Sequence, residues 1–178
     1  ISYWNKSGNL TGYQNLNWAF ARFEPEAPCY IKSFKVWVMG QAGKVTIALL
    51  GHNAGSPVPE VFAGTNGEVN MGVWESDVAP PSGQAVELNV ELPEPVWFAD
   101  DQFFIGVRSD NTNLYFATDQ TVNPASCESE SGGFYYFQSV LGSNGEWALG
   151  DKSFAADVVV DYPKKEPAGY FRDETTDL

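Results

Sequence analysis

Apolar and polar residues alternate with a period of two over much of this chain. In the clearest run, Val86, Leu88 and Val90 alternate with polar residues. Alternation of this kind predicts half-buried β-strands, because successive side chains of a strand point to opposite faces. The same pattern predicts further strands near residues 18–22 and at 34–38, 44–49, 101–109, 114–116, 134–140 and 156–161.

Segments rich in Gly, Pro, Asn and Ser separate these runs and are typical of turns. No segment carries the i, i+3, i+4 spacing of apolar residues that a long amphipathic helix requires. We therefore predict an all-β fold, an antiparallel two-sheet β-sandwich of jelly-roll type with roughly eight to ten strands. One sandwich domain is expected over residues 15–162, with an N-terminal lead segment at 1–14 and a polar C-terminal tail at 163–178.

The chain is strongly acidic, which narrows the classes of partner. Its 10 Lys and Arg stand against 23 Asp and Glu, a formal net charge of −13. Nucleic acid and anionic membrane surfaces both require a basic face, so neither is expected as a partner. No run of about 18 apolar residues is present that could span a membrane, which predicts a soluble protein. One His and two Cys leave few catalytic sets apart from carboxylates, and we expect no enzymatic activity.

Three stretches together resemble one family of extracellular domains. Residues 28–51 carry two predicted strands followed by a turn of small residues, Gly106 lies within a late strand, and Gly145 and Trp147 belong to a turn before the last strand. In these features the chain is similar to the jelly-roll accessory and adhesion domains of large secreted bacterial proteins, a group that resembles carbohydrate-binding modules. It departs from their usual Pro-Gly turn, where it has Ser-Pro-Val-Pro at residues 56–59. The resemblance implies an extracellular or cell-surface location and a domain without its own catalytic site.

Several aromatic residues lie opposite the apolar faces of the predicted strands. Exposed Trp and Tyr rings stack on the C–H faces of sugars, so these residues are candidates for glycan binding. The alternative is that they fill the core or the rim of a wide sandwich. The candidate ligand-binding residues are Trp97, Trp147, Tyr115 and Tyr136.

An oxygen-rich run at residues 109–113, with Asp119 one strand later, is a candidate site for a structural calcium ion. Calcium binds about six to eight oxygens from carboxylates, amides and carbonyls. The candidate ligands are Asp110, Asn111, Asn113 and Asp119. The alternative is ordinary turn chemistry, because Asx side chains hydrogen-bond to their own backbone.

Glu128, Glu130 and Glu146 lie in predicted loops that can share one end of a sandwich. A glycosidase needs two carboxylates about 5–10 Å apart across a cleft. In so acidic a chain, the simpler interpretation of these residues is solvated surface charge. His52 lies in a Gly-containing turn, where a lone His is more often solvated than catalytic.

Three functions fit these observations. The first, which we favour, is a non-catalytic extracellular module for binding or adhesion to glycan or cell-surface material. The second is a structural subunit that assembles with copies of itself through residues 1–17 and 163–178, with Tyr170 and Phe171 as anchors in the tail. The third is a carboxylate-based glycan hydrolase or lyase.

We predict that Cys29 and Cys127 form a disulfide bond, with two unrelated thiols as the alternative. The two cysteines follow Ala-Pro and Ala-Ser, both turn-like settings, and an exported protein would meet an oxidising environment. Thiol titration of the unreduced, guanidinium-unfolded protein should then detect no free cysteine. Titration of both cysteines, or Cα atoms well outside the roughly 4.4–6.8 Å that disulfide geometry allows, would contradict the pairing.

Overall fold

The computed structural model describes residues 1–4, 6, 8, 10–12, 18–51, 69–99, 102–119, 138–141, 147–149 and 153–164. For residues 69–70, 138–141 and 147–149 it describes the backbone alone. These ranges contain twelve strands and no helix, and hence no helix suited to crossing a bilayer. The predicted all-β class is confirmed.

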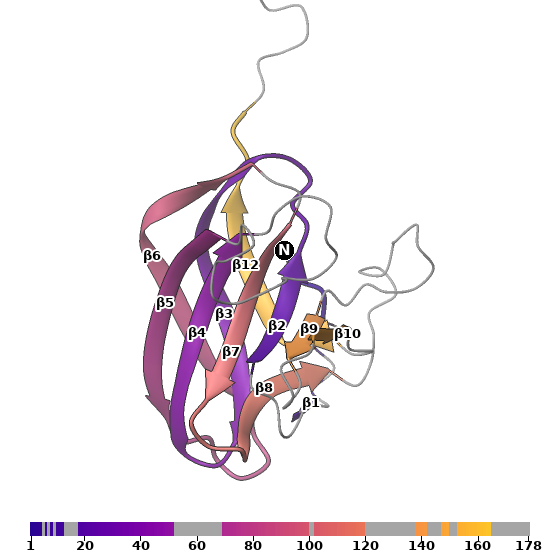
Figure 1. The fold of residues 1–178 in the computed structure, drawn as a ribbon, viewed down its shortest axis with the longest axis vertical. Helices are drawn as coiled ribbons and strands as arrows, with labels where there is room; N and C mark the ends of the chain where they lie inside the picture. Colours follow the sequence, from indigo (N-terminus) through magenta and orange to yellow (C-terminus); the bar gives the residue numbers. More distant parts are fainter. Residues whose placement is uncertain are drawn as a thin grey trace, which may run out of the picture.

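The strands form two six-stranded antiparallel sheets, which confirms the predicted sandwich (Figure 1). The first, called here the β3 sheet, contains β1 (Leu10–Gly12), β3 (Cys29–Gly40), β6 (Val86–Phe98), β8 (Leu114–Asp119), β11 (Ser153–Phe154) and β12 (Ala156–Asp161). The second, the β4 sheet, contains β2 (Trp18–Phe23), β4 (Gly43–Gly51), β5 (Val69–Val78), β7 (Phe103–Ser109), β9 (Gln138–Leu141) and β10 (Trp147–Leu149). Four of the twelve strands lie outside the segments predicted as strands: the short β1, β10 and β11, and the ten-residue β5.

The pairing of the strands is nested around one hairpin-like pair. At the centre β4 pairs with β5, and outside it β3 pairs with β6 and β2 pairs with β7. The outermost pair joins the N-terminal segment to β12 through the bridge between Ser2 and Asp157. Because β3 and β6 lie in one sheet and the strands adjacent to them in sequence lie in the other, the chain repeatedly crosses between the layers.

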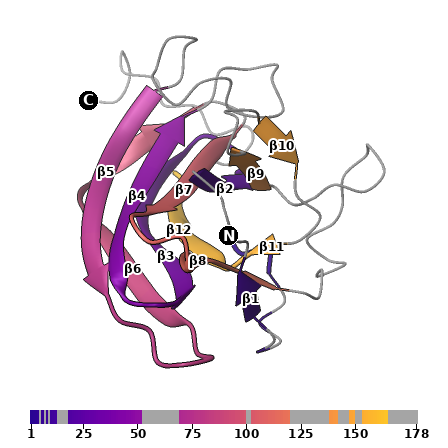
Figure 2. The same cartoon turned by 60° about the horizontal axis from the view of Figure 1, so that its bottom comes forward.

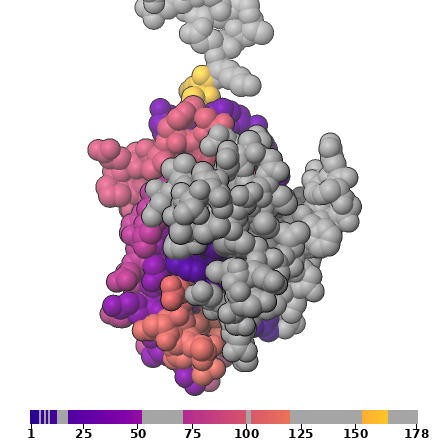
Figure 3. Space-filling view, viewed as in Figure 1, coloured from indigo at the N-terminus to yellow at the C-terminus, as the bar shows by residue number. Residues whose placement is uncertain are grey.

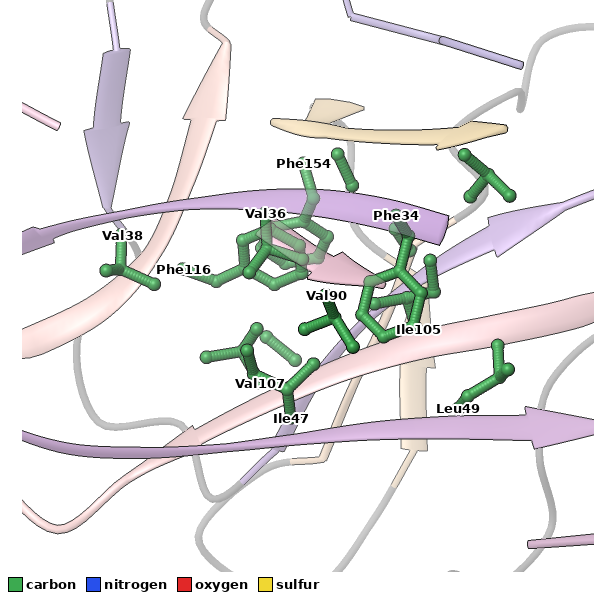
Figure 4. Packing of buried hydrophobic residues seen from close by; sticks show 14 of the residues in the cluster. Phe34, Val36, Val38, Ile47, Leu49, Val90, Ile105, Val107, Phe116 and Phe154 are labelled. Atoms are coloured by element: carbon green, nitrogen blue, oxygen red, sulfur yellow. The ribbon is translucent and has the colours of Figure 1, made fainter. Parts of the chain in front are cut away.

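The core lies between the inner faces of the two sheets (Figure 4). It is built from the alternate positions that the period-two pattern predicts to face inward. These residues include Phe34, Val36 and Val38 of β3, Val45, Ile47 and Leu49 of β4, and Phe103, Ile105 and Val107 of β7, all of them buried. Burying one such side chain contributes about 1.5–3 kcal/mol, so this layer holds the two sheets together.

A β-bulge near the start of β3 changes which of its alternate positions face the core. Cys29 and Ile31 point into the core, as does Phe34, although an uninterrupted strand would turn Phe34 to the opposite face. The register with β6 shifts between Ile31 and Ser33, where residues 92–95 stand opposite the single residue Lys32. This stretch of β6 includes two prolines, which lack the N–H of a sheet ladder. The bulge therefore keeps both halves of β3 packed on one core.

The β4 sheet is also buried on its outer face near its centre. Phe20 and Phe104 are fully buried there and belong to a second apolar cluster, separate from the main core. Gly106 lies beneath them, and a Cβ added to it would stand 2.3 Å from the Phe20 ring. Glycine at this position lets the Phe20 ring lie directly on the sheet backbone.

The N-terminal segment packs on the β3 sheet (Figure 2). The Ile1 backbone nitrogen donates a hydrogen bond to the Val158 carbonyl at 2.6 Å, and the Trp4 indole donates to Asp157 at 2.9 Å. Trp4 is buried, and β1 pairs with β8. Residues 1–4 and 10–12 therefore pack against the sandwich.

Cys29 lies fully buried at the start of β3, and its thiol is free in this structure. Burial raises the pKa of the Cys29 thiol, which lowers its reactivity. Cys127, the predicted partner, lies outside the described residues, so the disulfide stays a prediction.

The packing of the N-terminal segment predicts a pH dependence of stability. Burial raises the pKa of Tyr3 from 10.0 to about 12, and its hydroxyl donates to the Glu24 carbonyl. Between pH 10 and pH 12 the unfolded chain loses this proton before the folded one does, so stability should fall with rising pH by up to about 2 kcal/mol. Denaturant unfolding at several pH values should give a smaller alkaline loss for Tyr3→Phe than for the wild type. The exposed control Tyr30→Phe should keep the wild-type slope, and equal slopes for all three proteins would contradict the burial of Tyr3.

Candidate functional site

Two aromatic rings lie together on the outer face of the β3 sheet. Tyr30 of β3 stands opposite Trp97 of β6, and their ring centroids are 4.9 Å apart with the planes tilted by 57°. Tyr30 is 41% exposed and Trp97 is 49% exposed. Large exposed rings that already contact one another form a preorganised apolar surface. We call Tyr30 and Trp97 the aromatic pair.

Both rings point to solvent because residues next to them in the sequence are buried in the core. Cys29 and Ile31, which flank Tyr30, and Phe98, which follows Trp97, are all buried in the core. Because side chains alternate along a strand, the residues between them must point to solvent. On the other side of Tyr30, Asp161 of β12 is its partner in the ladder and is exposed. The aromatic pair thus has a carboxylate beside it.

The predicted aromatic candidates differ in their exposure to solvent. Trp97 is exposed, as the glycan-binding prediction requires. Tyr115 is half-buried, and its ring lies over Gly12, where an added Cβ would come within 1.5 Å of the ring. Tyr115 therefore fits the alternative interpretation, in which the ring serves packing. Trp147 belongs to β10, of which only the backbone is described, and Tyr136 lies outside the described residues. Tyr30 was not among the predicted candidates, although its place between the apolar residues 29 and 31 indicates an outward-facing side chain.

The oxygen-rich run at 109–113 forms the turn between β7 and β8. Asp110 accepts a hydrogen bond from the Lys44 backbone N–H at 2.8 Å, and Asn111 accepts one from the Asn113 N–H at 3.0 Å. The Asn111 amide also donates to the Ala42 carbonyl at 3.0 Å. These side-chain oxygens are engaged by backbone donors, which is the turn alternative to calcium binding.

Asp119 does not join this turn. It ends β8, roughly 16 Å along the strand from Leu114 at about 3.3 Å per residue. There it is fully buried and stands opposite Leu10 and Ser153. The four predicted ligands are therefore not brought together. Across the described part of the chain, no three His, Cys, Asp or Glu side chains meet in a group suited to a metal ion.

A groove of about 370 Å³ runs between β5 and β6, which are edge strands of the two sheets among the described residues. Trp74, Glu75, Glu87 and Glu91 are among the residues that line it. None of these acids was predicted as a catalytic candidate. The carboxylates considered for that role, Glu128, Glu130 and Glu146, lie outside the described residues, as does His52.

The acids of this groove are solvated and partly neutralised. Glu75 lies 3.8 Å from the Lys44 ammonium and Glu87 lies 3.3 Å from the Lys35 ammonium, and both carboxylates are largely exposed. They lack the apolar surroundings in which a carboxyl group serves as a general acid. Charges along free edge strands also oppose pairing with other sheets, which gives these acids a structural purpose.

Comparison of the chain with protein-family models, with curated proteins and with solved structures found no match.

The hydrogen bonds of the β7–β8 turn lead to a stability prediction. Asn111→Ala removes the side-chain hydrogen bonds to the Asn113 N–H and the Ala42 carbonyl and a longer one, at 3.5 Å, to the Gln41 side chain. It should lower the free energy of unfolding by about 1–2 kcal/mol. The loss should be the same in calcium chloride and in EDTA, because the lost bonds are to groups of the protein and not to a cation. Asn113→Ala is the matched control and should change stability by less than about 0.5 kcal/mol. A melting temperature that rises with calcium in the wild type but not in Asn111→Ala would instead identify a cation site.

Proposed function

We propose that this protein is a non-catalytic extracellular module that binds glycan or other cell-surface material through the aromatic pair. The observation that carries this proposal is the exposure of two contacting rings on an open sheet face. Soluble proteins bury most of their aromatic surface, so a preformed exposed pair suggests a surface kept for a ligand.

The chemistry of the pair suits a sugar. The C–H face of a pyranose ring can stack on Trp97, and the tilted Tyr30 ring offers a second wall to the same ligand. Asp161, next to Tyr30 in the ladder, can accept hydrogen bonds from sugar hydroxyls. Both rings are held in place by buried neighbours, so binding would cost little conformational entropy.

The nested strand pairs support the jelly-roll assignment and, with it, the resemblance to secreted accessory and adhesion domains. Pairs β4–β5, β3–β6, β2–β7 and the N-terminal segment with β12 are those of a long hairpin rolled into two layers. An extracellular location follows from that resemblance and remains part of the proposal.

A carboxylate-based hydrolase is the second candidate, because the groove between β5 and β6 combines Trp74 with three glutamates. The exposure of its acids and their pairing with Lys35 and Lys44 favour the binding module over this candidate.

The proposal predicts that glycan binding depends on both rings. A glycan array followed by titration calorimetry on the best ligand should show binding that falls about tenfold or more in Trp97→Ala and in Tyr30→Ala. Stacking of one ring accounts for a loss of this size. Trp97→Phe should retain part of the affinity, since it keeps an aromatic face.

The matched control is Val73→Ala, which truncates an exposed apolar residue on β5 of the other sheet and should leave affinity unchanged. All variants should remain folded, and the two ring substitutions should lower the free energy of unfolding by no more than about 1.5 kcal/mol, the size of one cross-strand ring contact. Glycan binding unaffected by either ring substitution contradicts the proposed surface. Release of reducing ends from polysaccharide that is lost in Glu87→Gln would replace the binding module with the hydrolase.

A further inference from the structure

A second pocket lies on the outer face of the β4 sheet, on the opposite side of the sandwich from the aromatic pair. Its volume is about 260 Å³. Arg108 of β7, Thr46 of β4 and Glu75 of β5 are ladder partners and form one row across it, and Trp18 of β2 ends the row. In Figure 3 the indigo surface of β2 lies in a recess beside the salmon surface of the β7–β8 segment.

Two cations, Lys44 and Arg108, and two anions, Glu75 and Asp110, line this pocket, and the two cations differ in their ion pairing. Lys44 lies 3.8 Å from Glu75, and the Asp110 carboxylate accepts the Lys44 backbone N–H. Arg108 is exposed and makes no ion pair or hydrogen bond with any described residue. Of the two cations that line the pocket, Arg108 is therefore the one available to an anionic ligand.

We propose that this pocket binds a sugar that carries a carboxylate, such as a uronic or sialic acid, with Arg108 as the carboxylate-binding residue. A guanidinium presents two parallel N–H donors that match the two oxygens of a carboxylate. A carboxylate brings one negative charge to the pocket, whereas a doubly charged phosphate would bring two, close to Glu75 and Asp110.

The remaining groups of the pocket suit the hydroxyls of a sugar. Glu75 and Asp110 can accept hydrogen bonds from hydroxyl groups, and the Lys44 ammonium and the Thr46 hydroxyl can donate them. Trp18, which is almost fully buried, supplies a rigid apolar wall. The volume is smaller than that of a pocket for a drug-sized ligand, which matches one ring with its substituents. This proposal does not depend on the aromatic pair.

Calorimetry on the intact chain can test the proposal with two acid and neutral pairs of probes. The first pair is trigalacturonate and its methyl ester, and the second is sialyllactose and lactose. We expect at least one acid probe to bind about tenfold or more tightly than its neutral counterpart, and salt to weaken that binding. The probe that binds identifies the source of the carboxylate.

Arg108→Gln should lower the affinity for the acid probe by about tenfold or more and remove the difference from the neutral probe. Lys35→Gln is the matched control, because Lys35 is an exposed cation paired with a glutamate on the other sheet, and it should leave affinity unchanged. Trp97→Ala should also leave it unchanged, which separates this pocket from the aromatic pair. Absence of binding by both acid probes at millimolar concentration, equal binding of acid and neutral probes, or full binding by Arg108→Gln would each overturn the proposal.

Discussion

The packing of the two inner sheet faces against each other is the interaction on which the other features of this protein depend. Each strand in the core commits alternate side chains to that layer, and the intervening side chains are thereby placed outside. Burial of Ile31 turns Tyr30 outward, and burial of Val107 turns Arg108 outward. The residues that carry both proposed sites thus owe their positions to apolar neighbours one residue away.

The outer face of the β3 sheet differs between its two ends. At one end the N-terminal segment covers it, with the Trp4 and Trp37 rings 4.7 Å apart and Trp4 bonded to Asp157. Ala117 and Ala155 are buried in the same small cluster. At the other end Tyr30 and Trp97 remain exposed, although they make a ring contact of similar length. The Trp4–Trp37 contact is therefore part of the packing of the N-terminal segment. The similar Tyr30–Trp97 contact remains accessible because none of the described residues covers it.

Charged residues of the edge strands β5 and β6 are partly neutralised by ion pairs. Glutamates lie along β5 and β6, and Lys35 and Lys44 neutralise two of them. Such charged edges keep a sandwich from pairing with other sheets, and the net charge of −13 acts in the same direction by repulsion between copies. Arg108, at the second pocket, makes no ion pair with a described residue.

Much of the fold was predictable because period-two alternation is a local property. It identified most of the long strands and their inward faces, including Phe34 on β3 and Ile105 on β7, but not β5. It did not reveal the bulge after Ile31, since a change of phase depends on what the partner strand presents. Nor could it show that the N-terminal lead pairs with β12, because that contact joins residues 2 and 157.

The sequence by itself determined the all-β class and the acidic net charge, and it made Trp97 a candidate surface residue. Only the tertiary structure decided which residues meet. It brought Tyr30 to Trp97 and aligned Arg108 with Thr46, and it carried Asp119 away from the turn it was expected to join. The physical reason is register: a ladder sets which residues of distant segments stand opposite each other, and it follows from the packing of the whole core, which no local pattern contains.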